Sequence, residues 1–284
     1  MRTPIFVPGN RANMLEKALG FQADWVVCDL EDSVPEPEKN TARELVPQFT
    51  PRLAASGLSV MVRVNDLTTG RTEEDLLAVV SDSVSAISVG KVRSTSDIGA
   101  YDDLLAAAER AAGVTVGTTG LVPWIENAPA VQNAFAIATC SPRILALAFG
   151  GEDYTAAVGI PRTAAGDELR FPKSMVALAA HAAGVVPLDT PYVDFRNTEG
   201  LTAECIAARQ MGYKGKFAIH PGQIAGISQV FSPSESEIAE AQRLIAEWDK
   251  AVASGRGSFD LDGKMVDAPV IERARRTLRD AGLN

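Results

Sequence analysis

The sequence predicts an α/β fold of the (β/α)₈ barrel type, a TIM barrel, followed by a helix–hairpin–helix arm at the C-terminus. The main observation is an alternation of short apolar, β-branched runs with segments whose apolar residues recur at helical spacing. Eight such repeats close into a barrel that commonly occupies about 250 residues, which fits a chain of 284 residues with a short addition. No glycine fingerprint follows the first strand, which counts against a doubly wound dinucleotide-binding fold.

The barrel elements are predicted from these runs. The eight strands are expected at residues 5–7, 25–29, 60–64, 86–89, 120–125, 144–149, 185–188 and 217–219. Helical spacing between them is found at residues 14–19, 74–80, 101–112, 130–138, 173–183 and 203–211.

The last fifty residues follow a different pattern. Ser234 and Glu237 have the spacing of a capping box and predict the start of a helix that ends near Gly255. Two short apolar pieces flank Asp262-Gly263, which predicts a hairpin with a type I′ turn. A final helix is expected at 269–281, so the arm does not continue the barrel repeat.

We therefore expect a catalytic barrel at residues 1–231 and an arm or lid at 232–284 that packs on a neighbouring subunit. The chain has 27 Lys and Arg against 36 Asp and Glu, a net charge of −9. This balance argues against nucleic-acid or anionic-membrane binding, although a few converging cations can still hold an anionic ligand.

A cytoplasmic protein is expected from the cysteines and the N-terminus. The three cysteines lie in apolar surroundings without metal-ligand spacing, as in a reducing compartment. The first residues lack a signal-peptide core, and the longest span-like stretch, 174–188, is shorter than the roughly 18 apolar residues of a membrane helix.

Acidic residues and two cations follow the predicted strands, where active sites of such barrels are built. At the ends of the strands or just after them lie Asp29, Glu31 and Asp32 for the second strand, Arg63 for the third, Lys91 for the fourth, Glu126 for the fifth, and Glu152 and Asp153 for the sixth. Carboxylates gathered on one rim repel one another unless a cation neutralises them, and no Cys/His set for zinc is present. Mg²⁺ is the natural candidate, held by Glu126 and Asp153, with Glu31 and Asp32 acting through waters.

Structural explanations also exist for these residues. An acidic residue after a strand often caps the next helix, and Arg63 is as well suited to an ion pair with Glu31 or Asp32 as to a substrate carboxylate. His181 and His220 are expected to be structural. No Ser/His/Asp or Cys/His nucleophile arrangement is readable.

Several motifs, taken in order, resemble the citrate lyase beta subunit and malyl-CoA lyase family of barrel enzymes. They are FVPGNR at 6–11, DLEDSV at 29–34, EK at 38–39, AR at 42–43, RVN at 63–65, IEN at 125–127, AFGGED at 148–153, GYKGK at 212–216 and IHPGQI at 219–224. The resemblance covers nearly the whole chain.

The resemblance implies a Mg²⁺-dependent carbon–carbon lyase acting on a 3-hydroxyacyl-CoA, such as citryl-, malyl- or citramalyl-CoA, to give acetyl-CoA and a keto acid, or the reverse condensation. It assigns Glu126 and Asp153 to the metal and Arg63 to the keto-acid carboxylate. It also implies a homo-oligomer, a trimer.

The resemblance also implies residues that bind CoA and a residue that donates the proton completing the reaction. Arg2, Arg11 and Lys17 would lie toward the CoA phosphates. Asp267 would protonate the acetyl-CoA enolate in a neighbouring subunit; as a residue before Ala-Pro it is equally suited to capping the last helix.

The chain departs from the family pattern in three places. It has Gly90-Lys91 where proline commonly precedes the lysine, Asn127 where threonine commonly follows the glutamate, and Phe-Pro-Lys-Ser at 171–174 in place of a frequent Tyr-Ala-Arg-Ser. Two other functions fit the same site: thioester hydrolysis of the malate-synthase type, and a non-catalytic CoA-binding subunit of a complex.

Overall fold

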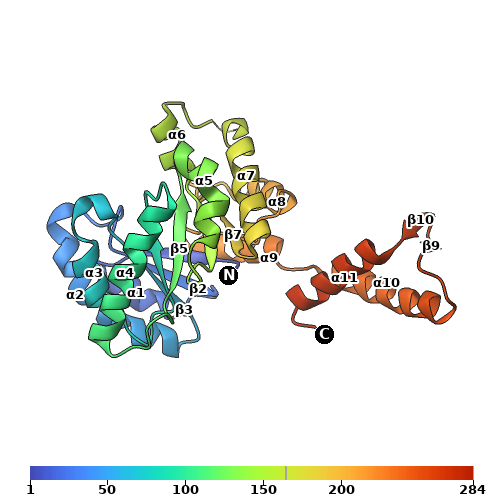
Figure 1. Cartoon of the computed structure of the whole chain (residues 1–284), viewed down its shortest axis with the longest axis horizontal. Coiled ribbons are helices and arrows are strands. Elements are labelled where there is room, and N and C mark those ends of the chain that lie inside the picture. The colour runs from blue at the N-terminus through green and yellow to red at the C-terminus, as the bar shows by residue number, and fades with distance from the viewer. Residues whose placement is uncertain (164, 284) are drawn as a thin grey trace. The chain divides into compact units, whose positions relative to one another are not determined.

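The structure is a computed structural model that describes residues 1–163 and 165–283. Eight parallel strands form one sheet in the order β1 to β8, surrounded by helices (Figure 1). The strands are β1 (Pro4–Pro8), β2 (Trp25–Asp29), β3 (Ser59–Val64), β4 (Ala86–Val89), β5 (Gly120–Ile125), β6 (Ala146–Phe149), β7 (Val186–Asp189) and β8 (Gly215–Lys216). Residue Ala218 bridges back to Ile5 of β1, so the sheet closes into the predicted (β/α)₈ barrel.

The barrel helices follow the strands in alternation. They are α1 (Ala12–Ala18), α2 (Lys39–Ala55), α3 (Thr72–Val79), α4 (Thr95–Ala112), α5 (Ala128–Thr139), α6 (Gly151–Val158), α7 (Asp167–Ala183), α8 (Thr198–Gln210) and α9 (Ile224–Phe231). Short 3₁₀ turns occupy Glu36–Glu38, Leu67–Thr69 and Pro221–Gln223. Within the described part of the chain, no helix is both long and apolar enough to cross a membrane.

Apolar side chains fill the inside of the barrel. The rings of Phe6, Trp124 and Phe217 pack together with centroids 4.5 to 5.9 Å apart. The Trp124 indole N–H donates to the Ser88 hydroxyl at 2.7 Å, which satisfies its one buried polar group. The interior is therefore a packed core, and room for a ligand must be sought at the strand ends.

The last barrel strand lies earlier than the sequence predicts. The apolar run at 217–219 predicts the strand there, but β8 is formed by Gly215–Lys216, and Ala218 makes only an isolated bridge to β1. Lys216 pairs in register with Asp189 of β7, and its buried ammonium also binds that carboxylate at 2.8 Å. The ion pair makes a lysine compatible with a buried strand, a compensation that hydrophobic patterning does not detect.

The chain forms two compact units, Met1–Ser228 and Gln229–Asn284. In the second unit, α10 (Glu235–Ala253) starts at the predicted capping box of Ser234 and Glu237. The strands β9 (Phe259–Leu261) and β10 (Lys264–Val266) form the hairpin. Asp262 and Gly263 have φ angles of 54° and 78°, which confirms the type I′ turn. The unit ends with α11 (Ala268–Asp280), which packs against α10.

A buried ion pair ties the barrel together at the amino ends of its strands. Arg143, before β6, donates to both carboxylate oxygens of Glu109 in α4 at 2.8 and 2.6 Å. The same carboxylate accepts the backbone N–H groups of Gly117 and Thr119 at 2.9 Å each. Burial alone would raise the pKa of Glu109, but these donors outweigh it and lower the pKa to about 2.

We expect Glu109→Gln to lower the free energy of unfolding by about 3 kcal/mol at pH 7, because it leaves Arg143 buried without its charged partner. Since the folded pKa is depressed, the stabilisation is complete above the unfolded pKa of about 4.5 and is lost as the pH falls toward 2. Urea unfolding at pH 7 and pH 3 measures this, and the difference between wild type and variant must shrink at pH 3. Glu16→Gln, which removes an exposed bidentate pair with Arg52, should change little at either pH.

Candidate active site

The ends of β2 and β3 are joined by a buried bidentate ion pair. Asp29 and Arg63 are register partners, and Arg63 Nε and Nη2 each donate to one Asp29 oxygen at 2.7 Å. The same carboxylate accepts the backbone N–H groups of Glu31 and Ser33 at 2.9 and 3.0 Å. Burial would raise the pKa of Asp29, but the Arg63 charge holds it below its usual range. The pair therefore fixes both the guanidinium and the loop that follows β2.

Arg63 also contacts the two carboxylates of that loop. Its Nη1 lies 3.0 Å from Asp32 Oδ2 and 3.3 Å from Glu31 Oε2. The ion pairs considered from the sequence thus exist, but the main partner of Arg63 is Asp29. The Phe6 ring packs against the guanidinium, with 4.7 Å between the guanidinium carbon and the ring centroid.

Glu31 is buried and Asp32 is not. Lys39 donates its ammonium to the carbonyl oxygens of Leu30 and Glu31 at 2.8 and 2.7 Å, which holds the loop from the other side. Burial raises the pKa of Glu31 to about 7, with Arg63 opposing the shift and Asp32 adding to it. The Asp32 side chain is 53% exposed, so the two neighbours differ in environment.

Glu126 directly follows β5 and is buried. Its Oε1 accepts the backbone N–H of Lys91 at 2.6 Å. A Cβ at Gly150 would lie 2.5 Å from Glu126 Oε2, so only glycine leaves room for this carboxylate after β6. Burial and the nearby charge of Asp153, in the first turn of α6, raise the pKa of Glu126 to about 8. Burial and the charge of Asp32 also raise the pKa of Asp153.

Negative charge exceeds positive charge on this rim. The carboxylates are those of Asp29, Glu31, Asp32, Asp66, Glu126 and Asp153, and the cations that act on them are Arg63, Lys91 and Lys39. Lys91 Nζ lies 3.7 Å from Glu31 Oε1 and 3.5 Å from Asp66 Oδ2. Burial is the main cause of the raised pKa values of Glu31, Glu126 and Asp153, and the neighbouring carboxylates add to it.

The donor set fits a divalent cation that prefers oxygen. Residues 1–163 and 165–283 hold no cluster of three or more His, Cys, Asp or Glu side chains arranged around one metal position. Mg²⁺ does not need such a cage, because it is held by one or two carboxylates and keeps several waters. The free edge of Glu126, with Asp153 nearby, is compatible with that mode of binding.

Of the remaining predicted residues, Arg2, Arg11 and Lys17 belong to other segments of the first unit and Asp267 belongs to the second unit. Arg11 precedes α1, is exposed and lies 3.8 Å from Glu38. Lys17 is in the last turn of α1, and Arg2 precedes β1, at the opposite end of that strand from the rim. Asp267 caps α11, its Oδ1 accepting the Val270 N–H at 3.4 Å. Their roles toward CoA and proton transfer remain predictions.

The sequence placed Asp29 and Lys91 on the rim but gave them no individual role, and it gave no role to Lys39. The register of neighbouring parallel strands is the signal for Asp29, since the last residue of β2 faces Arg63 of β3. Nothing in the sequence indicates that Lys39 turns inward, or that Lys91 adopts a φ of 55°.

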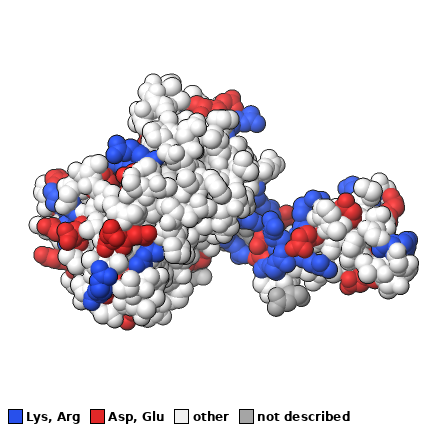
Figure 2. Space-filling view, in the orientation of Figure 1, with Lys and Arg blue, Asp and Glu red and all other residues white. Residues whose placement is uncertain are grey.

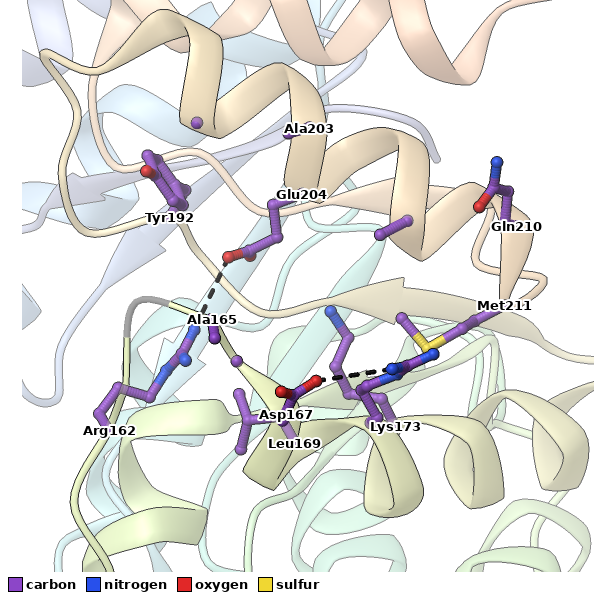
Figure 3. A pocket seen from close by; sticks show the side chains of 14 residues that line it. Arg162, Ala165, Asp167, Leu169, Lys173, Tyr192, Ala203, Glu204, Gln210 and Met211 are labelled. Atoms are coloured by element: carbon purple, nitrogen blue, oxygen red, sulfur yellow. Dashed lines mark ion pairs between the residues drawn. The ribbon is translucent and has the colours of Figure 1, made fainter.

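Away from the rim, a pocket of about 540 Å³ lies between α7 and α8 (Figure 3). Its charged walls are paired: Arg162 lies 3.7 Å from Glu204, and Arg170 lies 3.5 Å from Asp167. Beneath it, Asp189 binds the ammonium groups of Lys173 and Lys216 at 2.7 and 2.8 Å. The mutual pairing of these charges gives the cluster a structural role between β7, β8 and the two helices.

Comparison with known proteins identifies the family. Residues 2–221 match the model of the HpcH/HpaI aldolase/citrate lyase family, and the chain belongs to this family. It is 36% identical over 283 residues to the citrate lyase subunit beta of Leuconostoc mesenteroides subsp. cremoris, covering 100% of this chain and 94% of that protein. It is 33% identical over 300 residues to an L-malyl-CoA/beta-methylmalyl-CoA lyase of Cereibacter sphaeroides, covering 99% and 94% of the two chains.

A solved structure gives the same result. The Mycobacterium tuberculosis protein CitE, crystallised with magnesium, acetoacetate and coenzyme A, superimposes with a TM-score of 0.80 at 29% identity. The match covers 99% of this chain and 98% of that one. The expectations of this family and of a carbon–carbon lyase are thereby confirmed.

We expect Asp29→Asn to destabilise the fold by about 3 kcal/mol, because it removes the buried charge that both Arg63 and the loop after β2 depend on. Asp32→Asn removes an exposed partner of the same arginine and should cost less than about 1 kcal/mol. Chemical unfolding of the two variants measures the difference. Equal losses would show that Asp29 is no more important to Arg63 than Asp32.

Proposed function

We propose that this chain cleaves a 3-hydroxyacyl-CoA of the citryl-, malyl- or citramalyl-CoA type into acetyl-CoA and a keto acid, or runs the reverse condensation, with Mg²⁺. The observation that carries the proposal is the excess of carboxylates around Glu126 and Asp153, next to a guanidinium fixed by Asp29. The family relatives support it, since one is named an L-malyl-CoA/beta-methylmalyl-CoA lyase and another a citrate lyase subunit beta.

Glu126 and Asp153 are the proposed ligands of Mg²⁺. When bound, the ion supplies Lewis-acid stabilisation of negative charge on substrate oxygens and aligns the reacting atoms. The protein contributes a buried Glu126 whose Oε1 is fixed by the Lys91 N–H, so that its other oxygen keeps one direction.

Arg63 is the proposed contact for the carboxylate of the keto-acid half. Its Nε and Nη2 are held by Asp29, which sets the plane of the guanidinium, while Nη1 points to the half-exposed Asp32. A substrate carboxylate can replace Asp32 there without breaking the buried pair. A guanidinium fixed in this way positions the acid for carbon–carbon cleavage.

The chemistry requires one proton to leave the substrate hydroxyl and one to reach carbon. The hydroxyl loses its proton and becomes a carbonyl, the bond between the α- and β-carbons breaks, and its electron pair forms the thioester enolate. Glu31, with a pKa of about 7, is the proposed acceptor of the hydroxyl proton, because a group that titrates near neutral pH transfers protons readily in both directions. The half-exposed Asp32 beside it is proposed to assist through water.

We propose Asp267 of a neighbouring subunit as the group that protonates the enolate carbon. Its hydrogen bond to the α11 N-terminus is long, at 3.4 Å, and the carboxylate is only half-buried, so capping does not prevent a second role. Arg2, Arg11 and Lys17 are proposed contacts for the CoA phosphates, of which Arg11 lies nearest in sequence to the rim end of β1.

The face over α5 and α7 supports self-association of the chain, as a trimer in our proposal. It shows a broad area without charged side chains (Figure 2). Phe135 and Leu178 are 53% and 71% exposed there, beside an apolar groove of about 360 Å³. Exposed apolar patches of this kind mark interaction surfaces, and a second copy of the chain is the proposed occupant.

We expect acetyl-CoA to form from at least one of citryl-, malyl- and citramalyl-CoA, only when Mg²⁺ is present, when acetyl-CoA and free CoA are followed separately. Glu126→Gln should lower kcat/KM by at least about 100-fold, and Glu152→Gln, an exposed neighbour of Asp153, should not. Release of free CoA would instead identify a thioesterase of the malate-synthase type. Absence of turnover, with Mg²⁺ affinity unchanged in Glu126→Gln, would indicate a CoA-binding subunit.

Subunit mixing tests Asp267. Alone, Asp267→Asn should lower kcat by about 10²-fold or more, whereas Asp262→Asn, in the hairpin turn, should have no effect. When differently tagged Asp267→Asn and Glu126→Gln chains are co-expressed, doubly tagged oligomers should regain activity, because one barrel and another chain's arm are both intact. Mixed oligomers as inactive as their parents would contradict action between subunits.

A further inference from the structure

Lys91 has an unusual backbone conformation at the end of β4. Its φ is 55°, and among the described residues the only other non-glycine residue with a positive φ is Asp262 in the hairpin turn. A side chain with a Cβ rarely adopts this left-handed conformation, and where it does so near a site the strain is maintained by its surroundings. The Lys91 N–H donates to Glu126 Oε1 at 2.6 Å, and the φ of 55° sets the direction in which the Lys91 side chain and the following chain leave that amide.

The Lys91 side chain lies between two other buried carboxylates, those of Asp66, 3.5 Å from Nζ, and Glu31. Its Nζ lies 3.7 Å from Oε1 of Glu31, a buried oxygen that accepts no hydrogen bond within the described part of the chain. The other Glu31 oxygen lies 3.3 Å from Arg63 Nη1. Glu31 is therefore held between two cations, one from β3 and one following β4.

Gly90 brings these groups together. A Cβ at this position would lie 2.9 Å from Glu31 Oε1 and 3.4 Å from Glu126 Oε1. Because position 90 has no side chain, both carboxylates lie against the same short stretch of backbone. Two buried carboxylates so placed repel each other, and something must keep their directions apart.

We propose that Lys91 is a positioning residue that separates the two carboxylates: its amide fixes Glu126, and its ammonium holds Glu31 away from it. Glu126 Oε2, which packs beside Gly150 and accepts no hydrogen bond within the described part of the chain, is the oxygen left for a divalent cation, and Glu31 stays beside Arg63. This inference rests on the proposed function for the identity of the cation. A lysine serving only solubility would need neither a left-handed backbone nor a buried carboxylate as its partner.

Two substitutions separate the backbone contribution from that of the side chain. Lys91→Asn removes the ammonium but tolerates the left-handed conformation, so the amide stays directed at Glu126. Lys91→Val also removes the ammonium but disfavours that conformation because its Cβ is branched. Calorimetric titration of the full chain with Mg²⁺ alone compares them. We expect Lys91→Val to bind Mg²⁺ at least tenfold more weakly than Lys91→Asn.

The contribution of the Lys91 ammonium is measured by comparing kcat values. Lys91→Asn should bind Mg²⁺ at least as tightly as wild type, because a nearby positive charge is gone, while kcat at saturating Mg²⁺ and substrate falls tenfold or more. Lys91→Arg should recover most of kcat. Loss of Mg²⁺ affinity and kcat in proportion, without recovery by arginine, is the pattern of a merely structural residue and would overturn the side-chain role.

A third variant keeps the inference testable if Lys91→Val does not fold. Gly90→Ala leaves Lys91 in place but pushes Glu31 Oε1, and it should lower kcat at least fivefold while cooperative unfolding is retained. Equal Mg²⁺ affinities in folded Lys91→Asn and Lys91→Val, or a wild-type kcat in Gly90→Ala, would overturn the inference although wild type binds Mg²⁺. Failure of wild type to bind Mg²⁺ would overturn both this inference and the proposed function.

Discussion

The accumulation of negative charge at the carboxyl ends of the strands is the constraint on which the site depends. Parallel strands deliver their carboxyl ends to one rim, and in this chain six carboxylates, those of Asp29, Glu31, Asp32, Asp66, Glu126 and Asp153, lie at or just after those ends. Buried carboxylates remain charged only when cations or N–H donors face them. The arrangement of Asp29, Arg63 and Lys91 follows from that requirement, and what they leave uncompensated at Glu126 is available to a divalent cation.

The carboxylates of the rim fall into two kinds, those that are fully paired and those that are not. Asp29 is fully paired with Arg63, so its pKa is lowered and its function is to hold the guanidinium and the following loop. Glu126 receives a single backbone N–H, so its pKa is raised and one edge of it stays free. A carboxylate that is completely satisfied stabilises the fold, and one that is incompletely satisfied can bind a ligand.

Much of the fold and the set of rim residues could be predicted from the sequence, because hydrophobic periodicity places strand ends and strand ends define the rim. The sequence was less informative about which rim residues pair with one another. Arg63 has three acidic neighbours along the loop, and only the strand register shows that Asp29 is the principal one. The position of β8 was missed because buried Lys216 does not look like a strand residue until its carboxylate partners are known.

The glycines at the strand ends show why composition alone does not describe such a site. Gly90 and Gly150 contribute no functional group, but a Cβ at either position would collide with a carboxylate oxygen that the site needs. The space they leave decides where Glu31 and Glu126 point, and the left-handed Lys91 between β4 and its helix then fixes one of them. The ability of this rim to hold a metal thus depends on backbone shape as much as on its acidic residues. The same carboxylates on a rim with side chains at those two positions would be pushed into different directions and would pair with different cations.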